Sequence, residues 1–433
     1  MSAINPQASE LNDIIEAENA SVTTMLSAKG KGIFFPAKGI LGQTAAAKGK
    51  RINATIGIAL EDDGTPMRLP AIEKLVSLPP AAVFPYAPSF GDAELRRVWL
   101  ANIRGKNPSL GDTQLSTPVV TNALTHALSI AGYLFLDPGD TLILPDLYWG
   151  NYNLIFKNGY DAKLATHTTF VDGAYHVDGL RQALKAGGIG KKVVLLNFPN
   201  NPTGYTATEA EMDALRDVLV AAASAGNDLV VLIDDAYFGL VYEDGVGRES
   251  MFAKLADSHE RLLAVKIDGA TKEDYVWGLR VGFLTYAVRG GTAALYSALE
   301  AKTAGAVRGN ISNASQLSQS LVKAALQSDT YAVEKEAKFE ILQRRYTRIK
   351  EILAAHPEYS EAFVPAPFNS GYFLCLQLEA DPERVRQILL KDFDTGTIAA
   401  SGLLRIAFSA TPFGLLEDLF ANIFAATKAA QAE

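Results

Sequence analysis

The stretch from Leu229 to Tyr237, LVVLIDDAY, decides the fold, because an unbroken apolar run stops at two aspartates. A continuous apolar run is typical of a parallel strand that is covered on both faces. Similar strand-like runs lie at Ser116 to Thr121, Thr141 to Pro145, Val193 to Asn197 and Leu263 to Ile267. Helical spacing alternates with them at Ala123 to Phe135 and at Glu209 to Ser224, where Thr208 is placed to cap the helix. This alternation predicts an α/β domain with a mostly parallel central sheet flanked by helices.

The two ends of the chain differ from this centre. The first 66 residues are polar and rich in glycine and lysine, and a long charged helix is predicted from Val333 to His356. Two predicted strands of a second sheet follow, at Phe373 to Leu378 and at Leu404 to Phe408. We therefore expect an N-terminal arm with part of a small domain at 1–66, a large domain at 67–328, and the rest of that small α+β domain at 329–433.

The bulk composition is that of an ordinary globular protein. Hydrophobic residues make up 48% of the 433 residues and charged residues 20%, which provides material for a large core. The formal net charge of −8 argues against general binding to nucleic acid or to anionic membranes. No apolar run reaches the roughly 20 residues of a membrane span, and Met1 to Ala20 is acidic, so we expect neither a membrane segment nor a secretory signal.

Cysteine and histidine are both scarce. Cys375 is the only cysteine, so no intrachain disulfide can form and a cytoplasmic location is expected. The five histidines lack the spacing of metal ligands, and we expect no metal site. His126 falls inside an apolar helix, where a core position is the simpler interpretation.

Lys272 is the candidate nucleophile. An exposed lysine titrates near 10.4, so an amine that attacks a carbonyl at neutral pH needs a lowered pKa. Burial and a nearby cation would lower it, and Arg280 is such a cation eight residues further on. Lys266 is a rival, but it lies within a predicted strand. The simpler alternative for Lys272 is an exposed loop lysine.

Asp234 stands at the carboxyl end of a predicted buried strand, where ligand-binding loops of α/β sheets lie. A carboxylate there can hold the protonated nitrogen of a pyridine ring, although a turn-capping aspartate is the alternative. Asp235 should point the other way in an extended chain. Tyr237 and Asn201, the latter opening the motif Asn-Pro-Thr-Gly, are candidate donors to an oxygen on the same ring.

In their order and spacing these motifs resemble those of the fold-type I pyridoxal 5'-phosphate (PLP) enzymes of the class I/II aminotransferase family, aspartate aminotransferase among them. The resemblance extends from about Ile52 to Phe408 and implies the fold-type I architecture, with a large and a small domain. It implies that Lys272 forms an imine with the cofactor, Asp234 pairs with the ring nitrogen, Asn201 and Tyr237 address the ring oxygen, and Arg280 meets the phosphate.

Further cofactor residues follow from the same resemblance. Asn122 and Ala123 open a predicted helix whose N-terminal amides would bind phosphate, with Asn122 standing where relatives have glycine. Asparagine tolerates unusual backbone angles, which would preserve the loop. Gly269 replaces a hydroxyl residue that often donates to the phosphate. Trp149 corresponds to the aromatic residue that stacks on the ring, with Tyr148 as a competitor.

The resemblance also implies a substrate site shared between two subunits. Arg405 would grip the α-carboxylate of an amino acid, since a guanidinium offers two parallel hydrogen bonds, although a structural salt bridge is the alternative. Gly57 would belong to a segment that closes over the substrate. Tyr86 would reach the phosphate of the neighbouring subunit in a homodimer. Arg308 would enter the partner's active site and favour dicarboxylic or aromatic substrates, unless it is an exposed loop arginine.

The expected activity is therefore that of an aminotransferase. It would move an amino group between an L-amino acid and a 2-oxo acid by ping-pong chemistry. The amino acid would be aspartate, glutamate or an aromatic one. Two alternatives remain. The first is a PLP-dependent carbon–sulfur lyase or another PLP enzyme of fold type I, and the second is a non-catalytic effector-binding module.

Overall fold

The computed structural model describes residues 4–26, 31–32, 39–74 and 78–432. Its centre is a seven-stranded sheet. The strands, in spatial order, are β2 (Val119–Asn122), β10 (Val281–Ala287), β9 (Leu262–Asp268), β8 (Asp228–Asp234), β7 (Lys191–Asn197), β3 (Thr141–Pro145) and β4 (Lys163–His167). Neighbours from β9 to β4 pair in parallel, whereas β10 runs antiparallel to both β9 and β2. The predicted α/β fold with a mostly parallel sheet is confirmed.

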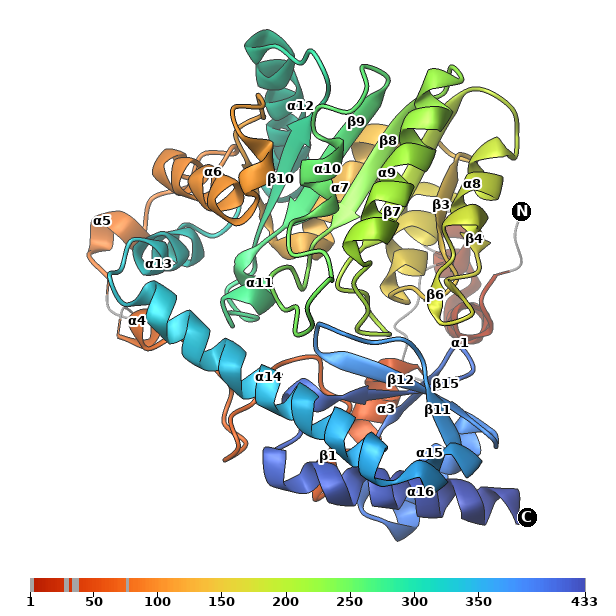
Figure 1. Cartoon of the computed structure of the whole chain (residues 1–433). Coiled ribbons are helices and arrows are strands. Elements are labelled where there is room, and N and C mark those ends of the chain that lie inside the picture. The colour runs from red at the N-terminus through yellow and green to blue at the C-terminus, as the bar shows by residue number, and fades with distance from the viewer. Residues whose placement is uncertain (1–3, 27–30, 33–38, 75–77, 433) are drawn as a thin grey trace.

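Both faces of this sheet are buried, as the continuous apolar runs predict. In β7, Val193 and Leu195 pack into one hydrophobic cluster, and Val194 and Leu196 pack into the other. Figure 1 shows α9 on the near face of the sheet and α7 behind it. The helices around the sheet are α6 (Ala93–Lys106), α7 (Ala123–Phe135), α8 (Val177–Lys185), α9 (Glu209–Ser224), α10 (Met251–Leu255), α11 (Ala270–Glu273), α12 (Ala293–Ile311) and α13 (Gln316–Leu326).

The N-terminus of α9 is fixed by the residues that the sequence predicts. The Thr208 side chain accepts a hydrogen bond from the backbone N–H of Glu211, whose carboxylate accepts one from the backbone N–H of Thr208. This reciprocal capping satisfies two donors that would otherwise have no partner. Short elements complete this part of the chain, namely a 3-10 turn (Pro108–Leu110), a π-helical turn (Asn153–Asn158), and a hairpin of β5 (Phe170–Val171) and β6 (Ala174–Tyr175).

A second sheet lies below the first in Figure 1, facing the carboxyl ends of the parallel strands. It is antiparallel, in the order β11 (Phe363–Pro365), β12 (Phe373–Leu378), β15 (Leu403–Ala407) and β14 (Ile398–Ala400). Beside it, β1 (Ile52–Asn53) pairs in parallel with β13 (Thr395–Gly396), so segments from both ends of the chain meet here. The domain limits 66/67 and 328/329 stay a prediction.

Helix α14 (Tyr331–Ala355) runs from beneath α13 down to the second sheet (Figure 1). At 1.5 Å per residue it is about 37 Å long. Its side chain Arg345 is fully buried and donates to the carbonyls of Ser409 and Leu60. The remaining elements are α1 (Pro6–Met25), α3 (Ile40–Ala46), α4 (Pro70–Glu73), α5 (Pro80–Val83), α15 (Pro382–Asp392), α16 (Leu416–Gln431) and 3-10 turns at Pro357–Glu361, Phe408–Ala410 and Phe413–Leu415.

Candidate active site

A cavity of about 1900 Å³ opens where the carboxyl ends of the central strands face the second sheet. The parallel register places Asn197, at the end of β7, beside Asp234, at the end of β8. Most of the residues predicted for the site line this one cavity, namely Gly57, Ala123, Trp149, Asn201, Asp234, Tyr237, Lys272, Arg280 and Arg405. The fold thus brings together side chains from widely separated segments, and it presents an amine, a carboxyl group and two guanidinium groups to one space.

Lys272 lies in α11, the single helical turn that follows β9. The side chain is half-buried, and its Nζ lies 5.1 Å from the centroid of the Tyr237 ring. Burial lowers the pKa of Lys272 to about 8, with Arg280 adding to the decrease and Asp234 opposing it. About a tenth of this amine is therefore uncharged and nucleophilic at pH 7, far more than for an ordinary exposed lysine.

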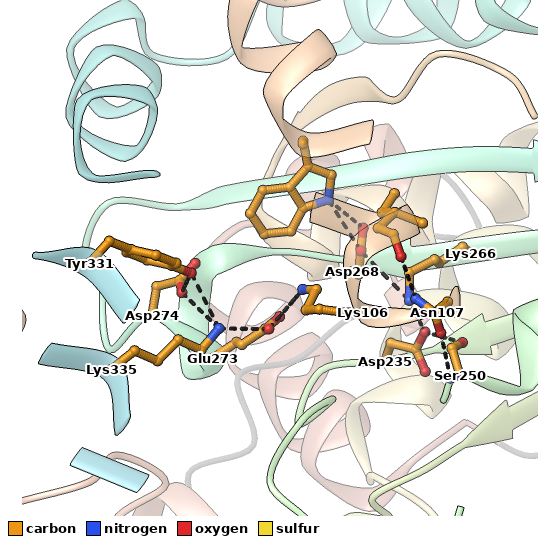
Figure 2. A network of polar contacts seen from close by, with 12 residues as sticks. Lys106, Asn107, Asp235, Ser250, Lys266, Asp268, Glu273, Asp274, Tyr331 and Lys335 are labelled. Carbon is orange, nitrogen blue, oxygen red and sulfur yellow. Dashed lines mark hydrogen bonds and ion pairs between the residues drawn. The ribbon is translucent and has the colours of Figure 1, made fainter. Parts of the chain in front are cut away.

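Lys266, the rival lysine, is enclosed in the protein on the other side of β8 and β9. It is 0% exposed, pairs with the carboxylate of Asp235 and lies 3.6 Å from Asp268 (Figure 2). Asp235 also accepts a hydrogen bond from Ser250. Neither Lys266 nor Asp235 lines the cavity, in agreement with the predicted alternation of Asp234 and Asp235 along the chain.

Asp234 is a buried carboxyl group with two donors. Its Oδ2 accepts from the hydroxyl of Tyr152 at 2.5 Å, and its Oδ1 accepts from the backbone N–H of Ala236 at 3.1 Å. Burial raises the pKa of Asp234, while the Tyr152 hydrogen bond and the Lys272 charge work against that increase. No motif predicted Tyr152 as a site residue, and its only signal in the sequence is its place in the aromatic stretch that contains Trp149.

The Asn-Pro-Thr-Gly motif forms a turn that is tied to the end of β8. The side chain of Asn197 accepts from the backbone N–H of Asn201 and donates to the carbonyl of Asp234, so this unpredicted residue couples the two motifs. Gly204 has φ +71°, and a Cβ there would lie 1.9 Å from the carbonyl oxygen of Phe373. Only glycine fits this position, which explains the last residue of the motif.

Gly269 also has a steric explanation. A Cβ at this position would lie 2.5 Å from the carbonyl oxygen of Val281 and 2.8 Å from the Cα of Gly282, so the neighbouring strand excludes a side chain. A hydroxyl group is nevertheless present two residues later. The Oγ1 of Thr271 is buried, has no hydrogen-bond partner among the described residues, and belongs to a residue that lines the cavity. An orphaned donor beside Lys272 is what a bound phosphate or similar anion would satisfy.

The expectation about Asn122 needs correction. Asn122 has an ordinary φ of −80°, and the residue in the left-handed region is Ala123, at φ +65°. The reason is that the backbone N–H of Asn122 donates to Nδ1 of His126 at 3.1 Å, and the turn into α7 follows one residue later. The Asn122 side chain is exposed and does not line the cavity. His126 is half-buried and holds the loop rather than simply filling the core.

Arg405 projects from β15 and is 5% exposed. Its Nη1 donates to Oδ1 of Asn201 at 3.3 Å and its Nη2 to the carbonyl of Thr55 at 3.2 Å, while its guanidinium lies 4.4 Å from the centroid of the Phe373 ring. No carboxylate of the described residues forms an ion pair with it, so the structural salt bridge is not observed. A buried cation without an anionic partner is a strong candidate for binding a ligand carboxylate.

Gly57 and Trp149 both line the cavity. A Cβ at Gly57 would lie 3.7 Å from the Phe373 ring, so the backbone passes close to that ring. The Trp149 ring meets Tyr152 edge-on at 5.6 Å. Tyr148 also lines the cavity, so position alone does not choose between Trp149 and Tyr148 as the stacking residue.

Tyr86 and Arg308, like Asn122, are predicted residues that the single chain does not bring into the cavity. Tyr86 is 91% exposed, and the exposed Arg308 donates to Oγ of Ser312 at 3.0 Å. Their segments meet, because the Ser89 hydroxyl donates to the carbonyl of Ser312 at 2.9 Å. Both residues therefore belong to neighbouring parts of one surface.

The chain belongs to the class I and II aminotransferases, because the pattern of the family described as "Aminotransferase class I and II" matches residues 69–420. Enzymes of this family depend on PLP. The donor set of the cavity fits that cofactor. Lys272 would supply the amine for its aldehyde, Asp234 the acid for its ring nitrogen, and Arg280 and Thr271 the groups for its phosphate.

Curated relatives match about half of the chain. An aspartate aminotransferase of Bacillus subtilis is 29% identical over 203 residues, which is 46% of this chain and 47% of that protein. A probable N-acetyl-LL-diaminopimelate aminotransferase of the same organism is 29% identical over 201 residues, again 46% of this chain and 47% of that protein. The chain thus spans about half the length of the curated relatives it matches.

Solved structures show the same fold over a greater length. An aminotransferase from Anaerococcus prevotii superposes with a TM-score of 0.81 at 23% identity, covering 93% of this chain and 99% of that one. The fold-type I architecture is thereby established. Among the described residues, none of the helices has the length and apolar character needed to cross a bilayer, and no group of three or more His, Cys, Asp or Glu is arranged to hold a metal ion.

Proposed function

We propose that the protein is a PLP-dependent aminotransferase that moves an amino group between an L-amino acid and a 2-oxo acid by ping-pong chemistry. One observation carries this proposal. A single cavity combines the low-pKa amine of Lys272, the buried carboxyl of Asp234 and the unpaired guanidinium of Arg405. When bound, PLP supplies an electron sink for the carbanion that forms at the substrate's Cα.

The residues divide the work of binding. Arg405 holds the α-carboxylate of the substrate, and its contacts with Asn201 and Thr55 fix the direction in which its guanidinium points. Asp234 stabilises a proton on the ring nitrogen, and Tyr152 and Ala236 orient its two oxygens. These groups are fixed before substrate arrives, so little reorganisation is needed during the reaction.

Lys272 moves the proton. With PLP bound, the free Nζ would take the proton from the substrate's Cα as a base and would deliver it to the C4′ carbon of the cofactor as an acid. A pKa near 8 suits both roles, because the protonated and the neutral amine are both present near neutral pH. The aromatic wall of Tyr237, Phe373 and Trp149 reduces the access of water.

A spectroscopic experiment separates this activity from that of a carbon–sulfur lyase. The purified protein, loaded with PLP, is mixed with single amino acids in the absence of any oxo acid. An aminotransferase converts the cofactor to its amine form in one turnover and releases a 2-oxo acid without ammonia. A lyase releases ammonia and pyruvate over many turnovers and keeps the aldehyde form, and that result would overturn the proposal.

The substrate proposal rests on Arg405 and Arg308. We propose a dicarboxylic amino acid or one with an aromatic side chain, because Arg405 provides for one carboxylate and the exposed Arg308 is available to bind a second across a subunit interface. The B. subtilis relative named aspartate aminotransferase agrees with a dicarboxylic substrate.

We propose that the protein works as a homodimer with shared active sites. Two large aromatic side chains, Phe84 and Tyr86, are 82% and 91% exposed on the segment that meets Ser312. Exposed rings in such a group mark an interaction surface. Sedimentation equilibrium of the wild-type protein and of Phe84→Ser/Tyr86→Ser tests this, since a dimer that dissociates only in the variant supports the interface.

We also propose that the dimer works in the cytoplasm, without nucleic-acid or membrane partners. We further propose that each chain consists of a large domain at 67–328 and a small domain built from 1–66 and 329–433. The net charge of −8 and the buried, free thiol of Cys375 support the first part. The two separate sheets, joined by α14, support the second. Limited proteolysis followed by mass spectrometry would test the limits at 66/67 and 328/329.

A further inference from the structure

Lys272 lies in a helical turn that is too short to be stable without contacts to other elements. Helix α11 has only four residues, Ala270–Glu273, and isolated helices of this length are unstable in water. Its orientation must therefore come from contacts with other elements. One such contact reaches Lys272 directly, because the hydroxyl of Tyr372 donates to the backbone carbonyl of Lys272 at 3.0 Å.

The next residue, Glu273, points away from the cavity into a buried cluster of charges. Its two carboxylate oxygens accept from Nζ of Lys106 at 2.7 and 2.9 Å, and Oε1 also accepts from Nζ of Lys335 at 2.7 Å. Burial works to raise the pKa of Glu273, but the two ammonium groups outweigh it and hold the pKa well below its usual range. Figure 2 shows this carboxylate between the two lysines.

The two lysines come from different parts of the fold. Lys106 is the last residue of α6, whereas Lys335 lies in the first turns of α14. Lys335 lies 3.3 Å from Oδ1 of Asp274, which also accepts from the hydroxyl of Tyr331 at 2.5 Å. The start of α14 thus contacts both residues that follow Lys272 in sequence.

The ion pairs of Glu273 and Asp274 differ from an ordinary buried ion pair in their location next to Lys272. A buried ion pair is weak evidence for stability, since desolvation offsets much of the attraction between the charges. Here the pairs fix a single turn from two sides, one residue from a reactive amine. Glu273 and its partners are not among the charges that shift the pKa of Lys272, so their effect on that amine is one of position.

We propose that Glu273 is a positioning residue. Its ion pairs with Lys106 and Lys335 fix the turn that holds Lys272 at the wall of the cavity. This inference rests on the proposed function. Helix α14 extends the connection, because its Arg345 donates to the carbonyl of Ser409 just beyond the strand that carries Arg405. The same helix therefore contacts the turn of the amine and the neighbourhood of the substrate-binding arginine.

Lys335→Met tests the proposal, and Lys338→Met is its matched control. Both lysines lie on α14 and both are mostly buried, but Lys335 pairs with Glu273 and Asp274, whereas Lys338 pairs with Glu61 and not with α11. The first readout is the rate at which the apoprotein captures PLP at Lys272 across a pH series. The second is the separation of kcat from KM for the amino acid.

For Lys335→Met we expect the maximal capture rate and kcat each to fall about 10- to 100-fold, since a misplacement of about 1 Å has such effects. The midpoint pH of capture should stay within about 0.3 pH unit of wild type and KM within about twofold, because Asp234 and Arg280, the charges that shift the pKa of Lys272, and the substrate contacts are unchanged. Lys335→Arg should restore most of the rate. Lys338→Met should leave both rates unchanged, although its melting temperature falls.

Equal behaviour of the Lys335→Met and Lys338→Met proteins would overturn the proposal, as would a shifted midpoint pH with an unchanged maximal rate. Should Lys335→Met not fold, Glu273→Gln replaces it with the same expected result. Failure of the proposed function looks different, because the wild-type apoprotein would then not capture PLP at Lys272 at all.

Discussion

The hydroxyl of Tyr152 donates a 2.5 Å hydrogen bond to the carboxylate of Asp234, and both residues line the cavity. Tyr152 is fully enclosed, and both burial and the neighbouring carboxylate raise its pKa well above the usual value, so it remains a donor. Burial alone would favour a neutral Asp234. The tyrosine therefore favours the ionised form of this carboxyl, which is the form that the proposed pairing with a ring nitrogen requires.

Tyr152→Phe should weaken the binding of PLP about tenfold. Without the hydroxyl, the pKa of Asp234 rises further, and a change of one pKa unit corresponds to about 1.4 kcal/mol. Equilibrium dialysis of the apoprotein against PLP measures this change. Tyr148→Phe is the control, because Tyr148 lines the same cavity but its hydroxyl bonds to Asn153. An equal loss in both variants would mean that Tyr152 acts only by packing.

The pH dependence of PLP capture by the apoprotein should report the pKa of Lys272. Only the neutral amine attacks the aldehyde, so the rate should rise with pH and level off above about 8. Asp234→Asn removes an anion that raises this pKa and should move the midpoint to lower pH. Arg280→Met removes a cation that lowers it and should move the midpoint to higher pH. Shifts in the opposite directions would contradict the assigned charges.

Lys272→Ala should abolish turnover and covalent attachment of PLP, while leaving room for noncovalent binding. The amine is the only group on the cavity wall predicted to form the bond and to move the proton. Borohydride reduction followed by peptide mapping shows where the cofactor is attached. A label on Lys266 in the wild-type protein would refute the assignment, since Lys266 is enclosed with Asp235.

Arg405→Lys should raise KM for amino acids about 10- to 100-fold with little change in PLP affinity. A lysine keeps the charge but loses the two parallel hydrogen bonds, and hydrogen bonds to charged groups contribute about 1.5–3 kcal/mol. Steady-state kinetics and cofactor titration measure the two effects separately. A comparable loss of cofactor binding would place Arg405 among the cofactor residues instead.

Mixing two defective variants tests whether the active sites are shared. Tyr86→Ala should weaken the partner's cofactor site, and Lys272→Ala should be inactive. A mixed dimer then contains one intact site, formed by Lys272 of one subunit and Tyr86 of the other, so activity should return on mixing. Arg308→Ala tests the substrate proposal separately, because KM should rise for dicarboxylic substrates and not for apolar ones. Mixtures that stay inactive would exclude the shared arrangement.

The alternation of apolar runs with helical spacing determined much of the fold. The bounds predicted for Ala123–Phe135, Thr141–Pro145, Glu209–Ser224 and Phe373–Leu378 are those of α7, β3, α9 and β12. Periodicity records which faces of an element are buried, and this information is local. The sequence did not indicate β4, whose residues are mostly half-buried or exposed and therefore lack a continuous apolar run.

The sequence by itself also determined that Asp234 and Lys272 follow strands and face one edge of a parallel sheet, which is where the cavity lies. Only the tertiary structure decided that Tyr152 donates to Asp234, that Thr271 leaves a hydroxyl unpaired, and that Lys335 contacts Glu273. Such partners are far apart in the chain or depend on the direction of one side chain. Packing of whole elements sets those contacts, and no local pattern of residues encodes them.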